Sequence, residues 1–255
     1  MLKISACIVC YNGGGEVIRA AQSLLRETKG CEFTLYLVDN ASPDGAGKTL
    51  AGFDWPENVH VICLPRNVGF GSGHNQVLPM LNSDYHFVIN PDIYVENNVL
   101  CQLSEWLSEH LEAVMVTPRL MFPTGEEQVL PKRRPTVFGL VARQGIPGFG
   151  HFGKKYAMQD KDLTQPQQIE FCTGSFFGMR TDVFKAIGGF DEDYFMYVED
   201  ADITQKALQK GQVWFLPQFH AYHAWQRAPK KSLKPFFQQL RSMCRYFKKW
   251  GFRLW

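Results

Sequence analysis

A carboxylate and an amide side chain follow a short apolar run near residue 90. Phe87–Ile89 is the run, and the turn Asn90-Pro91-Asp92 comes directly after it. Such a run is typical of a strand that is covered on both faces of a parallel sheet. Because proline has no amide hydrogen to donate to a sheet ladder, Pro91 should end the strand and leave Asp92 at its carboxyl end. A carboxylate there can hold Mg²⁺ or Mn²⁺ against a diphosphate, although Asn-Pro-Asp is also ordinary turn chemistry.

Four further polar clusters follow predicted strands or begin predicted helices. They are Tyr11-Asn12, Asp39-Asn40, the segment Asn67–Asn75 and the segment Glu199–Asp202. Each one alone could form a turn or complement the positive end of a helix. In a parallel sheet, however, the carboxyl ends of the strands lie along one edge, where α/β proteins bind ligands. We therefore expect the clusters that follow strands to converge on one crevice.

The elements that would position these side chains alternate between strands and helices. Apolar runs predict strands at Ile4–Cys10, Thr34–Val38, His60–Leu64, Phe87–Ile89 and Ala113–Thr117. Amphipathic spacing predicts helices at Glu16–Arg26, from just after Asn75 to about Asn82, and at Asn97–Glu109. This alternation favours an α/β fold with a mostly parallel, doubly wound, Rossmann-like sheet.

The second part of the chain has a different character. Residues 118–168 are rich in proline, glycine and basic residues and lack periodicity, which is typical of a long functional or mobile loop. Beyond it the pattern predicts strands at Ile169–Met179, Val213–Leu216 and Phe219–His223, and helices at Asp182–Ile187 and Asp200–Lys210. The basic run LPKRRP at 130–135 is expected to be a solvated loop, or alternatively a phosphate contact on a lipid-linked acceptor.

Composition indicates one large domain, or one domain with an appendage. The chain has 255 residues, 45% of them hydrophobic and 20% charged. Its seven cysteines are scattered and odd in number, and Cys7 and Cys10 lie inside an apolar strand, which favours a reducing cytosol and argues against a zinc site. No signal peptide is expected, and no apolar run approaches the roughly 20 residues that span a bilayer. The net charge of +2 conceals a basic carboxyl-terminal tail, so a nucleic-acid-binding face is not expected.

The tail Lys234–Trp255 predicts a basic amphipathic helix. Aromatic and aliphatic residues recur at helical spacing, and lysines and arginines lie between them. This pattern is typical of a helix that lies in a membrane interface. The alternative is a helix that packs on the core or on a twin subunit in a homodimer.

The ordered motifs resemble those of family 2 inverting glycosyltransferases of the GT-A fold. The motifs are ISACIVCYN, VDNAS, NVGFGSGHN, INPD, GSFFGMRTDVFKAIGGFDEDYF and YVEDADI, and they lie between about Ile4 and His223. The resemblance is closest to the bacterial rhamnosyltransferase-like branch, which builds O-antigen and related polysaccharides. It implies a GT-A domain over residues 1–225, with a nucleotide-sugar half at 1–117 and an acceptor and catalytic half at 118–225. Residues 226–255 would form the separate amphipathic helix.

The resemblance also implies a donor site. Tyr11 and Asp39 would line the nucleotide pocket, with Asp39 towards the base or ribose, and the loop from Asn67 to Asn75 would cover the ribose and diphosphate. The residues expected to bind the nucleotide-sugar are Tyr11, Asn12, Asp39, Asn40, Arg66, Asn67, Gly69, Asn75, Asn90 and Asp92.

Asp92 matches the last carboxylate of the family's metal motif and would bind Mg²⁺ or Mn²⁺. The first position of this motif is Asn90 rather than aspartate, which leaves one negative charge fewer for the metal. His223 lies where some family members have a histidine that completes the metal shell, and a structural histidine is the alternative. Neutral imidazole suits a borderline metal such as Mn²⁺.

Asp200 matches the catalytic base of the family, with Glu199 as a supporting residue or a competing base. Inversion requires a carboxylate that takes the proton of the acceptor hydroxyl as this hydroxyl attacks the anomeric carbon, and such general-base help gives roughly 10²–10⁴-fold in rate. A metal would neutralise the charge on the leaving diphosphate. The resemblance assigns the acceptor side to Gly174, Gly189, Phe190 and Asp191.

The expected activity is therefore transfer of a sugar to a glycan or lipid-linked oligosaccharide acceptor by a peripheral protein on the cytoplasmic face of the cell membrane. The resemblance favours L-rhamnose from dTDP-L-rhamnose, with UDP- and GDP-sugars as other donors. Two alternatives stay open: a non-catalytic nucleotide-sugar-binding or scaffold subunit of a polysaccharide-assembly complex, and a nucleotidyltransferase. The presence of both Asp92 and Asp200 counts against the scaffold.

Overall fold

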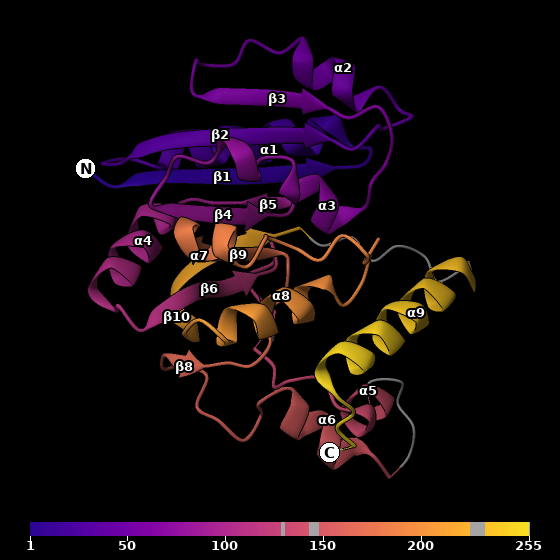
Figure 1. Cartoon of the computed structure of the whole chain (residues 1–255). Coiled ribbons are helices and arrows are strands. Elements are labelled where there is room, and N and C mark those ends of the chain that lie inside the picture. Colours follow the sequence, from indigo (N-terminus) through magenta and orange to yellow (C-terminus); the bar gives the residue numbers. More distant parts are fainter. Residues whose placement is uncertain (129–130, 143–147, 225–232, 255) are drawn as a thin grey trace.

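The computed structural model describes residues 1–128, 131–142, 148–224 and 233–254 (Figure 1). The strands of these ranges join in one ten-stranded sheet with the order β3-β2-β1-β4-β9-β6-β10-β5, while β7 pairs with β6 and β8 with β10. The strands are β1 (Lys3–Cys10), β2 (Glu32–Asp39), β3 (Val59–Cys63), β4 (Tyr85–Ile89), β5 (Ile93–Tyr94), β6 (Ala113–Met121), β7 (Glu127–Gln128), β8 (Gln167–Gln168), β9 (Phe176–Arg180) and β10 (Gln212–His223). The helices are α1 (Gly14–Glu27), α2 (Ala46–Ala51), α3 (Phe70–Asn75), α4 (Val99–Glu109), α5 (Val137–Ala142), α6 (Gly150–Tyr156), α7 (Thr181–Ala186), α8 (Glu199–Leu208) and α9 (Leu233–Trp250), and a short 3₁₀ turn lies at Leu78–Met80.

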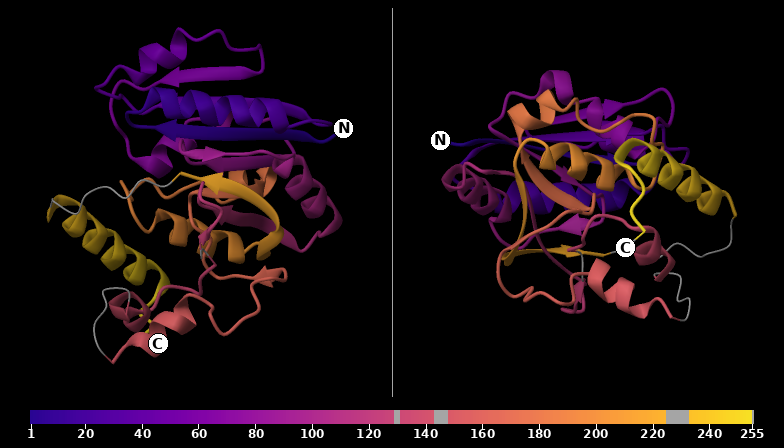
Figure 2. Two further views of the ribbon diagram at one scale, coloured as in Figure 1. Left: turned by 180° about the vertical axis from the view of Figure 1, so that it is seen from behind. Right: turned by 60° about the horizontal axis from the view of Figure 1, so that its bottom comes forward.

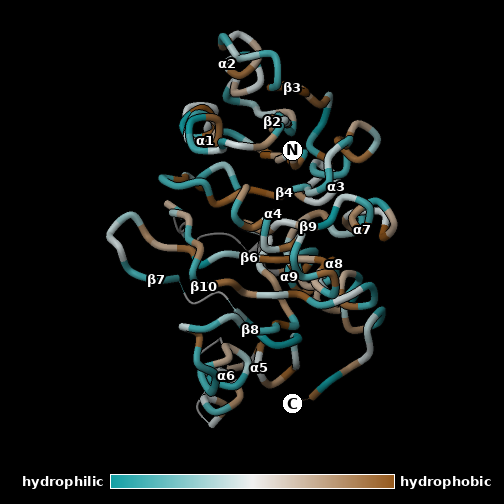
Figure 3. Tube along the Cα trace, turned by 90° about the vertical axis from the view of Figure 1, so that its left-hand side faces the viewer, coloured by the Kyte–Doolittle hydropathy of each residue, from teal (hydrophilic) through white to brown (hydrophobic). Residues whose placement is uncertain are grey.

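The first four long strands form the parallel layer that the sequence predicts. β1 pairs in parallel with β2 and β4, and β2 pairs in parallel with β3. Ile4–Cys10 and all of β4 are buried, because helices cover both faces of the sheet here. Figure 3 shows the apolar character of β4 and of the strands beside it in the centre of the molecule. Two clusters of buried apolar residues, one on each side of the sheet, form the core.

Beyond β4 the sheet becomes mixed. β9 lies antiparallel between β4 and β6, while β10 continues in parallel with β6. The predicted strand Ile169–Met179 is shorter in the structure and begins at Phe176. The two strands predicted after residue 212 are one strand, β10, whose register shifts between Leu216 and His220. This irregularity explains why the sequence pattern reads as two strands.

Residues 118–168 are more ordered than their sequence predicts. β6 runs to Met121, and β7, α5 and α6 follow within the described residues. Tyr156 of α6 is buried with Phe171 in a third apolar cluster, which also holds residues of α8 and α9. Contacts with distant aromatic residues therefore stabilise these short helices, and such contacts leave no periodic pattern in the local sequence.

The predicted tail helix is α9, and it packs on the rest of the molecule. Tyr246 and Phe247 are buried in the third cluster, and the segment after α9 reaches α5 through hydrogen bonds from the amides of Val137 and Phe138 (Figures 1 and 2). The boundary predicted between residues 225 and 226 lies outside the described residues. Phe237 and Leu240 remain 62% and 46% exposed on the outer side of α9. Among the described residues, no helix has the length and apolarity to cross a membrane.

The structure pairs two of the seven cysteines. Cys31 and Cys101 form a disulfide, with their Cα atoms 6.6 Å apart. Their sequence separation of 70 residues gives no local spacing signal, so the expectation of unpaired cysteines is wrong at these two positions. Cys7 and Cys10 are buried thiols in β1, where they pack as small apolar side chains, whereas Cys63 at the end of β3 is exposed.

Candidate active site

A cavity of about 350 Å³ opens at the carboxyl ends of the parallel strands. Seven of the ten expected donor-binding residues line it, and they come from the turns after β1, β2, β3 and β4. These residues are Tyr11, Asn12, Asn40, Asn67, Gly69, Asn90 and Asp92. The structure thus brings together, at one edge of the sheet, side chains that are up to 81 positions apart in the sequence, as the strand directions require.

Asn40 holds the loop before α3 in place. Its side-chain amide donates to the carbonyl of Gly69 at 2.9 Å, and its oxygen accepts from the amide of Val68 at 2.9 Å. Gly69 has φ of 92°, and a Cβ atom there would lie 2.3 Å from the carbonyl oxygen of Phe195. Only glycine allows this close approach. The amide of Phe70 donates to the same oxygen, so the donor loop is joined to the segment before α8.

The turn after β1 is fixed by the turn after β2. The amide of Asn12 donates to Ser42 Oγ, and the amide of Gly13 donates to Asp44 Oδ2, both at 2.8 Å. Hydrogen bonds from the amides of Gly13 and Ala46 hold the pKa of Asp44 below its usual range. A rigid frame therefore surrounds Tyr11, whose side chain is 53% exposed and available to a ligand.

Three expected donor residues do not line this cavity. Asp39 is buried at the end of β2, where both of its carboxylate oxygens accept from the amide of Ser42. Asn75 exchanges two hydrogen bonds of 2.9 Å with the backbone of Phe190, and it therefore holds that loop in place. Arg66 is exposed in the turn after β3.

Asp92 and His223 meet at the edge of the donor cavity. Oδ1 of Asp92 lies 3.2 Å from Nε2 of His223. Gln128 fixes the imidazole, because its Nε2 donates to the carbonyl of His223 and its Oε1 then faces His223 Nδ1, both at 2.9 Å. Nδ1 must carry the hydrogen, so in a neutral imidazole the lone pair of Nε2 points at the carboxylate. Two lone pairs in this position fit a shared cation.

A metal here would have few protein ligands. No group of three or more histidine, cysteine or acidic side chains gathers around a common point in the part of the chain that the structure describes. Mg²⁺ and Mn²⁺ commonly use one or two carboxylates and complete their shell with waters and substrate phosphates. Asp92 and His223 fit that mode of binding.

A second cavity of about 760 Å³ joins the donor site to the predicted base. His223, Asn90, Phe70 and Met196 line it on the donor side, and Glu199 and Asp200 line it on the opposite side. Phe70, Asn90 and Met196 also line the donor cavity, so the two spaces adjoin. Metal-site and base residues that lie over a hundred positions apart therefore face one continuous space.

Glu199 and Asp200 begin α8, where Glu199 is buried and Asp200 is half-buried. Asp200 accepts from the amides of Gly174 and Ala201 at 3.3 Å and 2.9 Å. Burial raises the pKa of Asp200, and the positive charge of Lys132 opposes that rise. Burial, followed by repulsion from Asp200, raises the pKa of Glu199 to about 8. Glu199 Oε2 is buried and has no hydrogen-bond partner among the residues that the structure describes. At neutral pH Glu199 therefore holds a proton, and Asp200 has the backbone hydrogen bonds that stabilise an anion.

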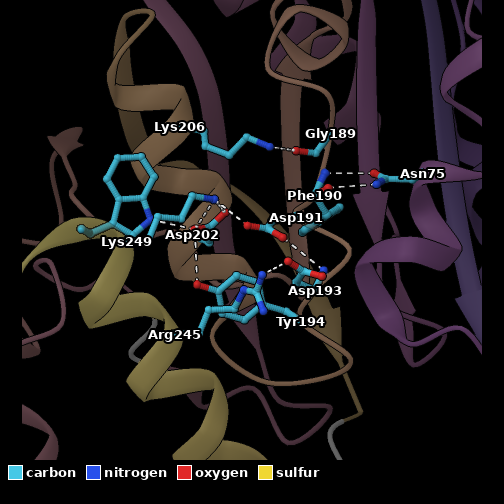
Figure 4. A network of polar contacts seen from close by, with 11 residues as sticks. Asn75, Gly189, Phe190, Asp191, Asp193, Tyr194, Asp202, Lys206, Arg245 and Lys249 are labelled. Carbon is cyan, nitrogen blue, oxygen red and sulfur yellow. Dashed lines mark hydrogen bonds and ion pairs between the residues drawn. The ribbon is translucent and has the colours of Figure 1, made fainter.

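Of the residues expected on the acceptor side, Gly174 lines this cavity. Gly189, Phe190 and Asp191 lie in the loop before α8 instead. Phe190 is buried in the core, and Asp191 forms an ion pair of 2.7 Å with Lys249 of α9. Figure 4 shows the network between this loop, α8 and α9.

Asp202 is the centre of that network. It is fully buried, and Lys249 Nζ lies 2.9 Å from its carboxylate. Trp250 Nε1 donates to Asp202 at 2.7 Å, and Ser242 of α9 donates to the carbonyl of Met196 at 3.0 Å. Asp202 thus points away from the cavity, as its spacing from Asp200 predicts. Helix α9 fixes both ends of the segment that carries the predicted base.

Several residues of the site have no role in the sequence-based assignment. They are Gln128, Lys132, Tyr156, Met196 and Tyr197, and all five line the larger cavity. Lys132 belongs to the basic run that was expected to be a solvated loop or, alternatively, a phosphate contact on a lipid-linked acceptor, and the structure places it at the cavity wall. For Gln128 and Tyr156 the sequence offers no signal, because pairing with distant residues brings them to the cavity.

Comparison with known proteins agrees with this geometry. The sequence model of glycosyl transferase family 2 matches residues 5–188. An N-acetylglucosaminyl-diphospho-decaprenol L-rhamnosyltransferase of Mycobacterium tuberculosis is 26% identical over 217 residues, which are 80% of this chain and 69% of the relative. The rhamnosyltransferase WbbL of Escherichia coli is 25% identical over 164 residues, 60% of this chain and 61% of the relative.

Solved structures show the same fold. GalNAc-T7, solved with UDP, GalNAc and Mn²⁺, superposes with a TM-score of 0.72 at 16% identity, covering 98% of this chain and 48% of that one. The mannosyltransferase PcManGT of Pyrobaculum calidifontis, solved with GDP-Man and Mn²⁺, gives a TM-score of 0.63 at 14% identity, covering 97% of this chain and 64% of that one. The S. aureus protein TarS, residues 1–349, gives 0.64 at 18% identity, covering 99% and 67%. With the fold, the cavity at the strand ends and the family match in agreement, the chain belongs to glycosyl transferase family 2 and is a glycosyltransferase of the GT-A type.

Proposed function

We propose that the protein transfers L-rhamnose from dTDP-L-rhamnose, with inversion, to a lipid-linked sugar during synthesis of a cell-surface polysaccharide such as O-antigen. The two rhamnosyltransferases among its relatives support the choice of donor and acceptor. The observation that carries the proposed mechanism is the continuous cavity from the donor pocket to Asp200.

In this mechanism Asp200 is the base. It takes the proton of the acceptor hydroxyl while that oxygen bonds to the anomeric carbon and the bond to the nucleoside diphosphate breaks. Glu199, protonated at neutral pH, adds no second negative charge beside the attacking oxygen. The loop held by Asn40 and Gly69 covers the donor and excludes water from the space between the donor and Asp200.

Asp92 and His223 would hold Mg²⁺ or Mn²⁺ beside the donor diphosphate. When bound, the cation neutralises negative charge on the leaving diphosphate. Gln128 keeps the His223 ring turned towards Asp92 through the hydrogen bond to Nδ1. The orientation of this pair supports the metal proposal independently of the residues' place in any motif.

We also propose that the protein works at the cytoplasmic face of the membrane and touches it with the outer side of α9. Phe237, Leu240 and Cys244 are exposed on that side, and Arg241 and Lys248 lie among them. Such a face suits an anionic lipid surface. The inner side of α9 packs on the core, so core packing and membrane contact use different faces of one helix.

Binding and turnover with a panel of dTDP-, UDP- and GDP-sugars test the donor. We expect dTDP-L-rhamnose with Mn²⁺ to give the largest rise in melting temperature and transfer to a lipid-linked N-acetylglucosamine acceptor. Asp92→Ala should abolish the part of nucleotide affinity that depends on the metal, and should leave the metal-free affinity unchanged. Tight donor binding without turnover on any acceptor would point to a scaffold subunit, and release of pyrophosphate from a nucleoside triphosphate to a nucleotidyltransferase.

Flotation with vesicles of phosphatidylglycerol and phosphatidylcholine tests the membrane contact. The double substitution Phe237→Ser and Leu240→Ser should weaken binding to the vesicles without lowering the melting temperature. Leu111→Ser is the matched control, because Leu111 is 78% exposed and lies between α4 and β6, away from the tail. Equal losses in both variants would reject α9 as the contact.

A further inference from the structure

A third space, of about 230 Å³, is lined by Glu199 and Asp200 and by none of the residues that line the donor cavity. Its wall is mostly aromatic and aliphatic and comes from α5, α6 and α9 and from the segment before β9. Leu140, Tyr156, Phe171, Met243, Tyr246 and Phe247 make up this part of the wall. We name this space the aromatic pocket. Lys132, Glu199, Asp200 and Gln239 add polar groups to the lining. The aromatic and aliphatic part of the wall suits an apolar chain.

The aromatic pocket adjoins the larger cavity. Lys132, Tyr156, Tyr197, Glu199 and Asp200 line both spaces. An acceptor in the larger cavity with a hydroxyl at Asp200 can therefore extend past Lys132, so that the group attached to its sugar reaches the aromatic pocket.

Lys132 is held rigidly at this junction. Its carbonyl accepts from the amides of Glu170 and Phe171 at 3.3 Å and 3.1 Å, which fixes the backbone beside β9. Its ammonium group lies 4.9 Å from the centre of the Phe171 ring. The next residue, Arg133, forms a double ion pair with Asp160 and donates to the carbonyl of Lys155. These contacts attach the basic run to α6 and to the segment that follows it. A lysine at the mouth of an apolar pocket provides a positive charge for an anionic group on the ligand.

On the basis of the proposed function, we propose that Lys132 and the aromatic pocket are the subsite for the anionic and apolar part of the acceptor. A phosphate attached to the accepting sugar pairs with Lys132, and the first part of the apolar chain beyond it lies in the aromatic pocket under α9. The accepting sugar itself lies in the larger cavity with its hydroxyl at Asp200. The substrate class is therefore a sugar joined through phosphate to a long apolar chain.

This arrangement also orients the acceptor relative to the membrane. The outer side of α9 carries the exposed apolar and basic residues, and the inner side forms one wall of the aromatic pocket through Met243, Tyr246 and Phe247. An apolar chain that leaves the pocket beside α9 is close to the surface that we propose to touch the lipid.

Two synthetic acceptors test the assignment of Lys132. One carries the sugar on a diphosphate with an undecyl chain, and the other carries the same sugar as a neutral undecyl glycoside. Lys132→Gln should raise KM for the diphosphate acceptor by about tenfold or more relative to KM for the neutral glycoside, because a charge-assisted contact is lost with the diphosphate acceptor alone. Lys132→Arg should restore most of the affinity. Lys154→Gln, an exposed lysine on α6, is the control and should change neither value.

The two acceptors distinguish a failure of the Lys132 subsite from a failure of the proposed function. If the unaltered protein transfers sugar to neither acceptor, the proposed function fails. If Lys132→Gln lowers activity on both acceptors equally, or acts only by shifting the pH dependence of kcat, Lys132 serves Asp200 and the phosphate subsite is refuted.

The length of the apolar chain tests the aromatic pocket. For the unaltered protein, KM should fall as the chain on the diphosphate acceptor grows from ethyl to undecyl. Met243→Asp should remove this dependence and leave the KM of the ethyl acceptor unchanged. Because Met243 is half-buried at the pocket wall, the substitution could also destabilise the protein. The melting temperature of the variant is therefore measured together with the kinetics, and Met243→Gln serves as the milder variant. If Met243→Gln keeps the full dependence on chain length, the chain binds elsewhere.

Discussion

The donor half and the acceptor half of the site are built in different ways. The donor cavity is made by turns at the ends of parallel strands, and hydrogen bonds between neighbouring turns hold it. The acceptor side is made by short helices, by one aromatic cluster and by α9, which comes from the end of the chain. In the first case the sheet places the residues, whereas in the second case side-chain packing does. The comparison teaches that donor binding and acceptor positioning should be separable by mutation.

Asp200→Asn should have the largest effect. The variant keeps the shape of the side chain and loses the base, so kcat should fall by roughly 10²–10⁴-fold. Nucleotide affinity, which depends on the other half, should stay unchanged. Asp182→Asn, at the corresponding place in the first turn of α7, is the control. Full turnover in Asp200→Asn would overturn the assignment of the base.

Lys249→Met should disturb the acceptor half alone. It leaves the fully buried Asp202 without its ion-pair partner, and breaking such a pair typically destabilises a protein by about 3 kcal/mol. We expect the melting temperature to drop by about 6–12 °C by thermal unfolding and KM for the acceptor to rise. Lys248→Met, at the exposed neighbouring position, should change neither quantity. A parallel loss of nucleotide affinity would contradict the separation of the two halves.

Gly69→Ala should disturb the donor half. The added methyl group would meet the carbonyl of Phe195, and the backbone conformation is also unfavourable for alanine. We expect nucleotide affinity, measured by calorimetry, to fall by about tenfold. Gly125→Ala isolates the backbone effect, because Gly125 has a similar φ of 87° and no atom within 4 Å of an added Cβ. Equal effects of both variants on nucleotide affinity would show that the contact with Phe195 is unimportant.

Glu199→Gln should have a smaller effect, visible in the dependence of stability on pH. The folded state holds a proton on Glu199 up to about pH 8, whereas the unfolded chain releases it near the ordinary glutamate pKa of 4.5. Between these values the unfolded state binds fewer protons, so the free energy of unfolding decreases as pH rises. Glu199→Gln should flatten this decrease, which thermal unfolding from pH 5 to 9 measures. If the stability of Glu199→Gln decreases with pH as steeply as that of the control Glu105→Gln, Glu199 is ionised in the folded protein.

The same contrast explains what the sequence could and could not predict. The ends of the strands can be predicted directly from the apolar runs, and parallel pairing places these ends at one edge of the sheet. The sequence therefore predicts that Tyr11, Asn40, Asn67 and Asp92 lie together. No local sequence pattern predicts that β9 pairs antiparallel with β4 and β6. Gln128 and Lys132 reach the cavity through partners about 40 to 95 positions away, and such contacts are decided by tertiary packing.

Phe190 shows the opposite limit. It lies inside a motif of the family, and the resemblance therefore placed it with the acceptor, whereas the structure buries it in one of the two large apolar clusters of the core. A motif records which residues occur together and does not distinguish those that touch a ligand from those that hold a loop.

The hydrogen bond to the carbonyl of Phe195 connects the donor loop with the start of α8. This carbonyl accepts from the amide of Phe70 beside the nucleotide loop, and it lies a few residues before the left-handed residues Tyr197 and Val198, after which α8 begins. A shift of the nucleotide loop is therefore transmitted to the start of α8 through a short, tightly connected length of backbone. Such a linkage favours a compulsory order of substrate addition, in which the sugar nucleotide enters first and its arrival sets the final alignment of the proton acceptor.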